Sequence, residues 1–125
     1  MSTIFVLDQK ESAESLAMAL CQEGHVTYIS CDYKKALRQI AELTAAKAGP
    51  DLVLAEFLET DGAELCRELR RYGLTRKIKV VLMSRGGPHS NIDYYRRLGK
   101  SYGADDYLLK SDDLRAIARS IQHLI

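Results

Sequence analysis

The sequence lacks most of the features that mark specialised classes of protein. Its 18 Lys and Arg are balanced by 17 Asp and Glu, which leaves a formal net charge of +1. No global field would therefore draw the chain to nucleic acid or to an anionic membrane. No apolar run approaches the roughly 20 residues of a membrane span, and no basic region followed by a long apolar stretch opens the chain. We expect a cytoplasmic protein with no membrane partner.

Cysteine is scarce and poorly placed for a metal site. Cys21, Cys31 and Cys66 are odd in number, widely spaced and free of any CxxC or Cys/His pattern. We expect them to be small apolar filler in a reducing compartment, since free cysteine is among the most buried residue types.

The remaining composition is that of an ordinary globular domain. Apolar residues make up 46% and charged residues 28% of the chain, which is enough for a sizeable core and does not support disorder. A length of 125 residues fits one hydrophobic core. We therefore expect a single domain over residues 1–125.

Apolar periodicity switches repeatedly between short continuous blocks and helical stripes. Five blocks rich in Val, Ile, Leu and Tyr are expected to be strands: Thr3–Leu7, Val26–Ser30, Leu52–Glu56, Lys79–Ser84 and Asp106–Leu109. Between them, apolar residues recur at helical spacing, as at Ala13, Leu16 and Leu20. Five such βα units predict an α/β fold with a parallel sheet, right-handed crossovers and helices on both faces.

Polar residues stand at or directly after the ends of four of these strands. They are Asp8 with Gln9, then Glu56, Ser84 and Lys110. Sites in parallel sheets form at the carboxyl ends of the strands, near the point where the strand order reverses. We expect these residues to share one functional surface.

Three local motifs, taken with these strand ends, resemble the receiver domains of response regulators. Pro50–Glu56 is similar to the run into the family's phosphoacceptor, Asp61–Leu65 to the start of its third helix, and Gly103–Lys110 to its fifth strand. The resemblance covers the whole chain. It implies a flavodoxin-like (βα)5 fold, which is a doubly wound parallel sheet with strand order 2-1-3-4-5.

Two departures from the family pattern fall on its phosphorylation chemistry. In the family, strand-one acids, a strand-three aspartate and a loop carbonyl hold Mg²⁺, and that aspartate accepts a phosphoryl group. Here Glu56 stands at the phosphoacceptor position, and Gln9 replaces the second acid beside Asp8. Mg²⁺ prefers a rigid octahedron of oxygen ligands, so Asp8, Glu56 and the Leu58 carbonyl would form a weak or absent Mg²⁺ site. One extra methylene also moves the attacking oxygen by about 1.5 Å, which disturbs in-line transfer. No other cofactor is expected.

The resemblance also assigns a conformational switch. Ser84 stands at the hydroxyl that binds the phosphoryl group, Tyr107 at the strand-five aromatic that responds to it, and Lys110 at the family's lysine. Ser111 follows where the family generally has a proline after a cis bond. A cis bond costs about 3 kcal/mol without proline, so we expect a trans bond there.

Glu56 would project a permanent carboxylate into the space that a phosphoryl group fills in an active receiver. We expect Lys110 and Ser84 to be its partners through charge-assisted hydrogen bonds. One hypothesis is that this pairing holds the domain near an active-like conformation, with Tyr107 packed inward. The other is that Glu56 only neutralises Lys110 and that switching has been lost.

The function expected from this pattern is that of a pseudo-receiver. Such a domain is not an enzyme and serves as a phosphorylation-independent interaction module in two-component signalling. The alternative is a working receiver with Mg²⁺-dependent phosphorylation at Glu56. The expected partner is a signalling protein or a second copy of the chain, on the face formed by the fourth helix, fifth strand and fifth helix.

Two basic clusters leave a third interpretation open. Lys and Arg gather in residues 70–79 and 96–100, the second group beside Tyr94, Tyr95 and Tyr102. We favour a solvated face or a protein-partner surface over nucleic-acid binding, because no helix-turn-helix, RRM or OB pattern accompanies them. Residues 86–87, Gly-Gly, belong to no phosphate-binding motif and are expected to form a flexible loop.

Overall fold

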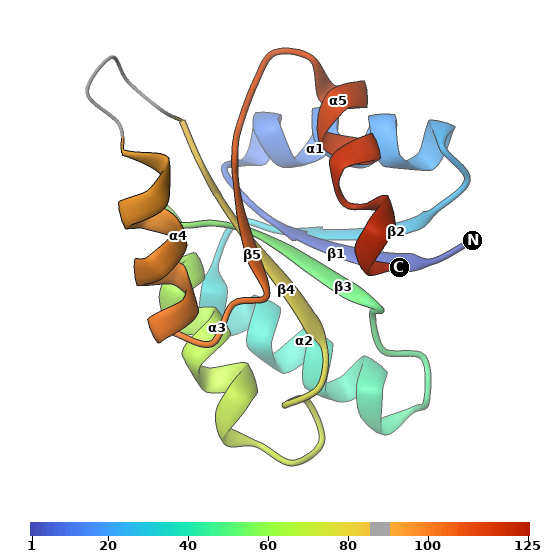
Figure 1. The fold of residues 1–125 in the computed structure, drawn as a ribbon. Coiled ribbons are helices and arrows are strands. Elements are labelled where there is room, and N and C mark those ends of the chain that lie inside the picture. The colour runs from blue at the N-terminus through green and yellow to red at the C-terminus, as the bar shows by residue number, and fades with distance from the viewer. Residues whose placement is uncertain (86–90) are drawn as a thin grey trace.

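The computed structural model describes residues 1–85 and 91–125, and the Gly-Gly loop expected at 86–87 lies outside them. Within the described residues, strands and helices alternate along the whole chain (Figure 1). The strands are β1 Thr3–Leu7, β2 Val26–Ser30, β3 Leu52–Glu56, β4 Lys79–Ser84 and β5 Asp106–Leu109. The helices are α1 Lys10–Gln22, α2 Tyr33–Ala45, α3 Gly62–Arg71, α4 Ile92–Ser101, α5 Leu114–Ser120 and a short 3-10 helix at Gln122–Leu124.

The strands form one parallel sheet in the order β2-β1-β3-β4-β5. Their bounds coincide with the five predicted blocks, and Ile4 of β1 lies opposite both Thr27 of β2 and Leu52 of β3. The order reverses between β1 and β3, so the sheet is doubly wound. The predicted flavodoxin-like α/β fold is confirmed.

Helices cover both faces of the sheet. Helices α1 and α5 lie on one face, and α2, α3 and α4 lie on the other (Figure 1). Because successive side chains of a strand point to opposite faces, Ile4 and Val6 pack toward α1 and α5, whereas Phe5 and Leu7 pack toward α2 and α3. The continuous apolar blocks read from the sequence are thus strands buried on both sides.

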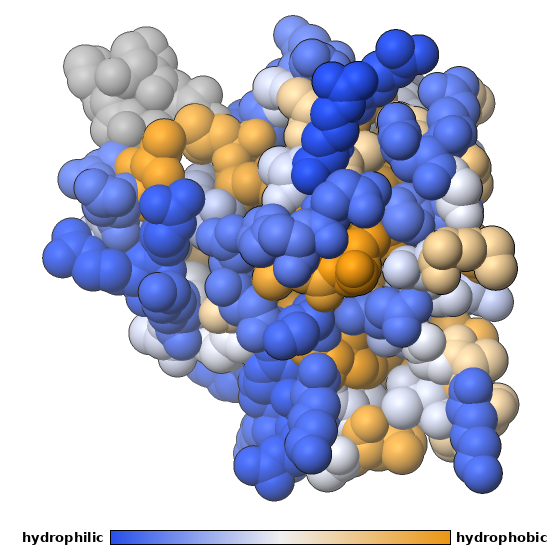
Figure 2. Space-filling model, turned by 45° about the vertical axis from the view of Figure 1, so that its right-hand side comes forward, coloured by the Kyte–Doolittle hydropathy of each residue, from blue (hydrophilic) through white to orange (hydrophobic). Residues whose placement is uncertain are grey.

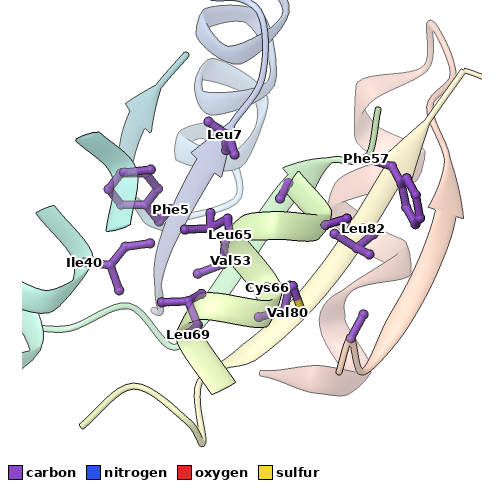
Figure 3. Packing of buried hydrophobic residues seen from close by; sticks show 14 of the residues in the cluster. Phe5, Leu7, Ile40, Val53, Phe57, Leu65, Cys66, Leu69, Val80 and Leu82 are labelled. Carbon is purple, nitrogen blue, oxygen red and sulfur yellow. The ribbon is translucent and has the colours of Figure 1, made fainter. Parts of the chain in front are cut away.

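The core beneath α2, α3 and α4 is the larger of the two. Figure 3 shows Phe5, Ile40, Val53 and Leu65 converging on it from β1, α2, β3 and α3. Cys66 belongs to this cluster and is fully buried, as expected, but Cys21 and Cys31 are exposed. That part of the prediction is wrong, because Cys21 lies in the last turn of α1 and Cys31 directly follows β2, the edge strand.

The face of the molecule drawn in Figure 2 is mostly hydrophilic. The face drawn in Figure 2 carries hydrophobic residues only in small separate patches between charged and polar ones. In the part of the chain that the structure describes, no helix is both long enough and apolar enough to cross a membrane.

Candidate functional site

The carboxyl ends of β1, β3, β4 and β5 meet at one edge of the sheet and bring four predicted residues together. Asp8 directly follows β1, Glu56 ends β3, Ser84 ends β4, and Lys110 directly follows β5. Asp8, Glu56 and Ser84 are at most 5% exposed, although all three are polar. Buried polar groups need partners, so their hydrogen bonds determine what this site can do.

Asp8 and Lys110 form a buried ion pair. Lys110 Nζ lies 2.7 Å from Asp8 Oδ2, and the two side chains are 12% and 1% exposed. The other Asp8 oxygen, Oδ1, accepts a 2.7 Å hydrogen bond from the Gln9 N–H. The backbone fixes this arrangement, since the Lys110 N–H donates to the Ser84 carbonyl at 2.9 Å and so continues the β4–β5 pairing beyond β5.

Glu56 turns back onto its own loop. Its Oε1 accepts the Leu58 N–H at 3.0 Å, and its Oε2 accepts the N–H groups of Glu59 at 2.6 Å and Thr60 at 3.0 Å. The Thr60 hydroxyl lies 3.4 Å from Oε2 and 3.2 Å from the Glu56 carbonyl oxygen. Three backbone N–H groups and a hydroxyl therefore surround one carboxylate, which is a nest of donors suited to an anion.

The expected pairing of Glu56 with Lys110 and Ser84 is wrong. Lys110 bonds to Asp8, and Ser84 bonds to Tyr107. The physical reason is the extra methylene of glutamate, which lets the carboxylate reach the N–H groups two to four residues ahead. Without Glu56 these N–H groups would lack a hydrogen-bond partner in the protein. Lys110 instead pairs with the buried carboxylate of Asp8.

Gly62 allows the loop to close tightly over Glu56. A Cβ atom at Gly62 would lie 2.2 Å from the Glu56 carbonyl oxygen, so only glycine permits this approach. Asp61 precedes it in the left-handed region, with φ 56°, and α3 begins at Gly62. Only four residues, 57–60, separate Glu56 from Asp61, because the chain turns sharply here.

Ser84 and Tyr107 form the second buried pair of the site. The Ser84 hydroxyl is hydrogen bonded to the Tyr107 hydroxyl, and Tyr107 is 2% exposed. Tyr107 therefore packs inward, as one hypothesis predicted, although its partner Ser84 is not bonded to Glu56. Its ring stacks on Tyr95 of α4 with centroids 5.8 Å apart and meets the edge of Phe57 at 6.3 Å.

Phe57 connects the Glu56 loop to α4. It directly follows Glu56, is 4% exposed, and also makes edge contacts with Tyr95 and Tyr102 at 6.2 and 6.1 Å. Figure 3 shows Phe57 beside Leu82 at one end of the core cluster. Aromatic contacts of this kind add about 0.5–1.5 kcal/mol each beyond burial, so the cluster fixes the loop against α4.

The residues expected to hold Mg²⁺ do not fit that ion as the structure arranges them. Both Glu56 oxygens face N–H donors, and Asp8 Oδ2 faces an ammonium group. Gln9 points elsewhere, with its Nε2 donating to Glu59 Oε2 at 2.6 Å. Over residues 1–85 and 91–125, no three His, Cys, Asp or Glu side chains gather as a metal site would require.

Two other predictions concern the bond after Lys110 and the basic clusters. The Lys110–Ser111 bond is trans, as expected without proline. Some residues of the basic clusters are engaged within the molecule: Arg70 donates to the carbonyls of Gly103 and Ile78 and pairs with Asp105, and Arg96 lies 3.6 Å from Asp106. Such pairing favours a structural role over phosphate contacts.

Sequence reasoning missed the residues that enclose Glu56. Thr60 is 8% exposed and Phe57 is 4% exposed, yet neither residue was among those expected at the site. The signal that would have found them is a glutamate followed by four residues and then Asp-Gly, because a long acid before a tight turn can accept the N–H groups of that turn.

A search of curated proteins finds a relative among transcriptional regulatory proteins. The chain is 27% identical over 128 residues to the alkaline phosphatase synthesis transcriptional regulatory protein SphR of Synechococcus elongatus, a match over 98% of this chain and 48% of the relative. The chain thus spans about half the length of that relative. No family model matches the sequence.

Solved structures resemble the chain over its whole length. The chemotaxis response regulator CheY4 of Vibrio cholerae superposes with a TM-score of 0.82 at 17% identity, over 100% of this chain and 99% of the other. The receiver domain of a histidine kinase from Syntrophus aciditrophicus gives 0.76 at 25% identity, over 99% and 89%. The fold is that of response-regulator receiver domains, and these relatives support a receiver-type domain.

Proposed function

We propose that the chain is a receiver-type module of two-component signalling that acts without phosphorylation and has no enzymatic activity of its own. The observation that supports this most directly is the use of Glu56. A phosphoacceptor needs a free carboxylate oxygen in line with the donor, but both Glu56 oxygens accept backbone N–H groups. Transfer would first require breaking these charge-assisted bonds.

The surrounding groups support the same proposal. Mg²⁺ neutralises charge in phosphoryl transfer, and Asp8 is the remaining acid that would hold it. Here Asp8 is neutralised by Lys110 at 2.7 Å instead. Lys110, which would bind an incoming phosphoryl group, is therefore paired with Asp8, which would bind the metal.

The proposed partner surface is the face formed by α4, β5 and α5. The inward position of Tyr107, bonded to Ser84 and stacked on Tyr95, supports a partner surface that needs no phosphoryl group to form. Ile92 and Tyr94 of α4 are 40% and 52% exposed and would contact the partner. A signalling protein or a second copy of the chain in the cytoplasm would occupy it.

The test compares the native chain with a variant that restores the family's acids. Amide NMR spectra are recorded with Mg²⁺ and beryllofluoride for the native chain and for Glu56→Asp/Gln9→Asp. We expect the native spectrum to stay unchanged at Ser84, Tyr107 and Lys110 and the double variant to respond. Glu64→Asp, an equivalent change on the exposed side of α3, is the matched control.

Two outcomes would contradict the proposal. One is a set of native shifts centred on Glu56, Ser84 and Lys110, and the other is an acid-labile 80 Da adduct on the native chain after acetyl phosphate treatment, roughly the mass of one phosphoryl group. Either would support the alternative, a working phosphoacceptor at Glu56.

A further inference from the structure

An apolar groove lies on the far side of the molecule from α1 and α5, between α2 and the loop that joins α3 to β4. Its volume is about 450 Å³. It is lined by Lys34, Leu37, Arg38 and Ala41 of α2 and by Tyr72, Leu74 and Thr75 of the loop. None of these residues belongs to the strand-end site or to the α4, β5 and α5 face.

The floor and one wall of the groove are apolar and open to solvent. Tyr72 and Leu74 are 55% and 56% exposed, although both are large hydrophobic residues. Leu37 and Ala41 are partly buried and form the floor, and Leu37 packs on the core beneath. Single exposed apolar residues need no explanation, but four that share one concave surface indicate a binding site.

The opposite wall carries the positive charges of Lys34 and Arg38; the Asp32 carboxylate interacts electrostatically with Lys34 but does not line the groove. In the part of the chain that the structure describes, Lys34 and Arg38 form no ion pair. Glu42, one helical turn beyond Arg38, does not line the groove. The arginines of the neighbouring helix α3 differ from Lys34 and Arg38 in this respect. Arg67, Arg70 and Arg71 are each paired with a carboxylate.

We propose that this groove docks an acidic amphipathic segment of a partner protein. Apolar side chains of the segment would cover Leu37, Tyr72 and Leu74, and its carboxylates would face Lys34 and Arg38. Charge complementarity selects this occupant, because an apolar floor with an unpaired cationic wall matches an apolar stripe flanked by Asp or Glu. The proposal does not depend on whether the domain is phosphorylated.

The test uses two synthetic helical peptides that share one Leu and Phe stripe. In the first the stripe is flanked by glutamates, and in the second by lysines. We expect the acidic peptide to shift the amide signals of α2 and residues 72–75 of the native chain, and the basic peptide to leave them unchanged. Binding of the acidic peptide should weaken as NaCl rises from about 50 to about 500 mM, since the rim charges are exposed.

Surface variants locate the site. Arg38→Glu and Leu74→Ser should each lower the affinity for the acidic peptide about tenfold. Lys35→Glu makes the same charge change on α2 outside the groove, and Met18→Ser removes an apolar side chain that is 66% exposed on α1, so both controls should bind as the native chain does. All four positions are exposed, and circular dichroism verifies that the variants remain folded.

Several results would overturn the proposal. The peptide experiments would do so through no shift with the acidic peptide at about 1 mM, equal binding of the basic peptide, or equal losses in the control variants. Self-association of the native chain in sedimentation that Arg38→Glu abolishes would also overturn it, because the occupant would then be a second copy.

Discussion

Lys110 and Asp8 form the buried ion pair of the strand-end site, with 2.7 Å between Nζ and Oδ2. They come from opposite ends of the sequence and meet because β1 and β5 end at the same edge of the sheet. A carboxylate that is 1% exposed depends strongly on such a partner, since the surrounding protein solvates it poorly. We therefore expect the pair to contribute to the stability of the fold.

Removing the lysine alone should be costly. Lys110→Met leaves the Asp8 charge buried without its partner and should lower the free energy of unfolding by about 3 kcal/mol. Asp8→Asn combined with Lys110→Met should recover most of that loss, because no uncompensated charge remains. Urea denaturation of both variants and of the exposed control Lys10→Met measures this. Equal losses in Lys110→Met and Lys10→Met would contradict a buried pair.

Neutralising Glu56 should loosen its loop. In Glu56→Gln one of the two oxygens becomes an NH₂ group that faces backbone donors. We expect a loss of about 1.5–3 kcal/mol, the range for hydrogen bonds to a charged group. Hydrogen exchange should show faster opening of the Leu58, Glu59 and Thr60 amides in particular. Glu14→Gln, the same change at an exposed position of α1, should change stability by less than about 0.5 kcal/mol.

Gly62, the first residue of α3, and Gly73, two residues beyond its end, should respond differently to substitution by alanine. Gly62→Ala places a Cβ against the Glu56 carbonyl oxygen and should cost about 1–3 kcal/mol, despite the higher helix propensity of alanine. Gly73→Ala meets open space and should leave stability within about 0.5 kcal/mol. Thermal unfolding distinguishes them. A neutral Gly62→Ala would mean that the loop does not close over Glu56 as described.

The three cysteines should separate into two reactivity classes. Burial raises the pKa of Cys66 to about 11, with Arg70 opposing and Asp105 adding to that effect. At pH 8 its thiolate would be about 0.1% populated, against roughly 25% for an ordinary thiol. An aromatic disulfide reagent should label the exposed Cys21 and Cys31 quickly and Cys66 only after unfolding. The labelling of the third thiol, which requires unfolding, should be absent in Cys66→Ala. Rapid labelling of all three thiols in the native chain would contradict the burial of Cys66.

The sequence by itself determined the architecture. Alternating apolar blocks and helical stripes specify five βα units, and continuous runs such as Val80–Met83 specify strands buried on both faces. Parallel strands then bring Asp8, Glu56, Ser84 and Lys110 to one edge, whatever the details of the loops. These conclusions follow from periodicity and chain direction, which are local properties.

Only the tertiary structure decided which of these groups bind one another. Sequence reasoning paired Glu56 with Lys110, but the choice depends on competition among donors that lie within a few ångströms only after folding. Three N–H groups of its own loop bind Glu56, Lys110 binds Asp8, and Ser84 binds Tyr107. The groove beside α2 likewise depends on how Tyr72 and Leu74 are left uncovered, which no periodicity encodes.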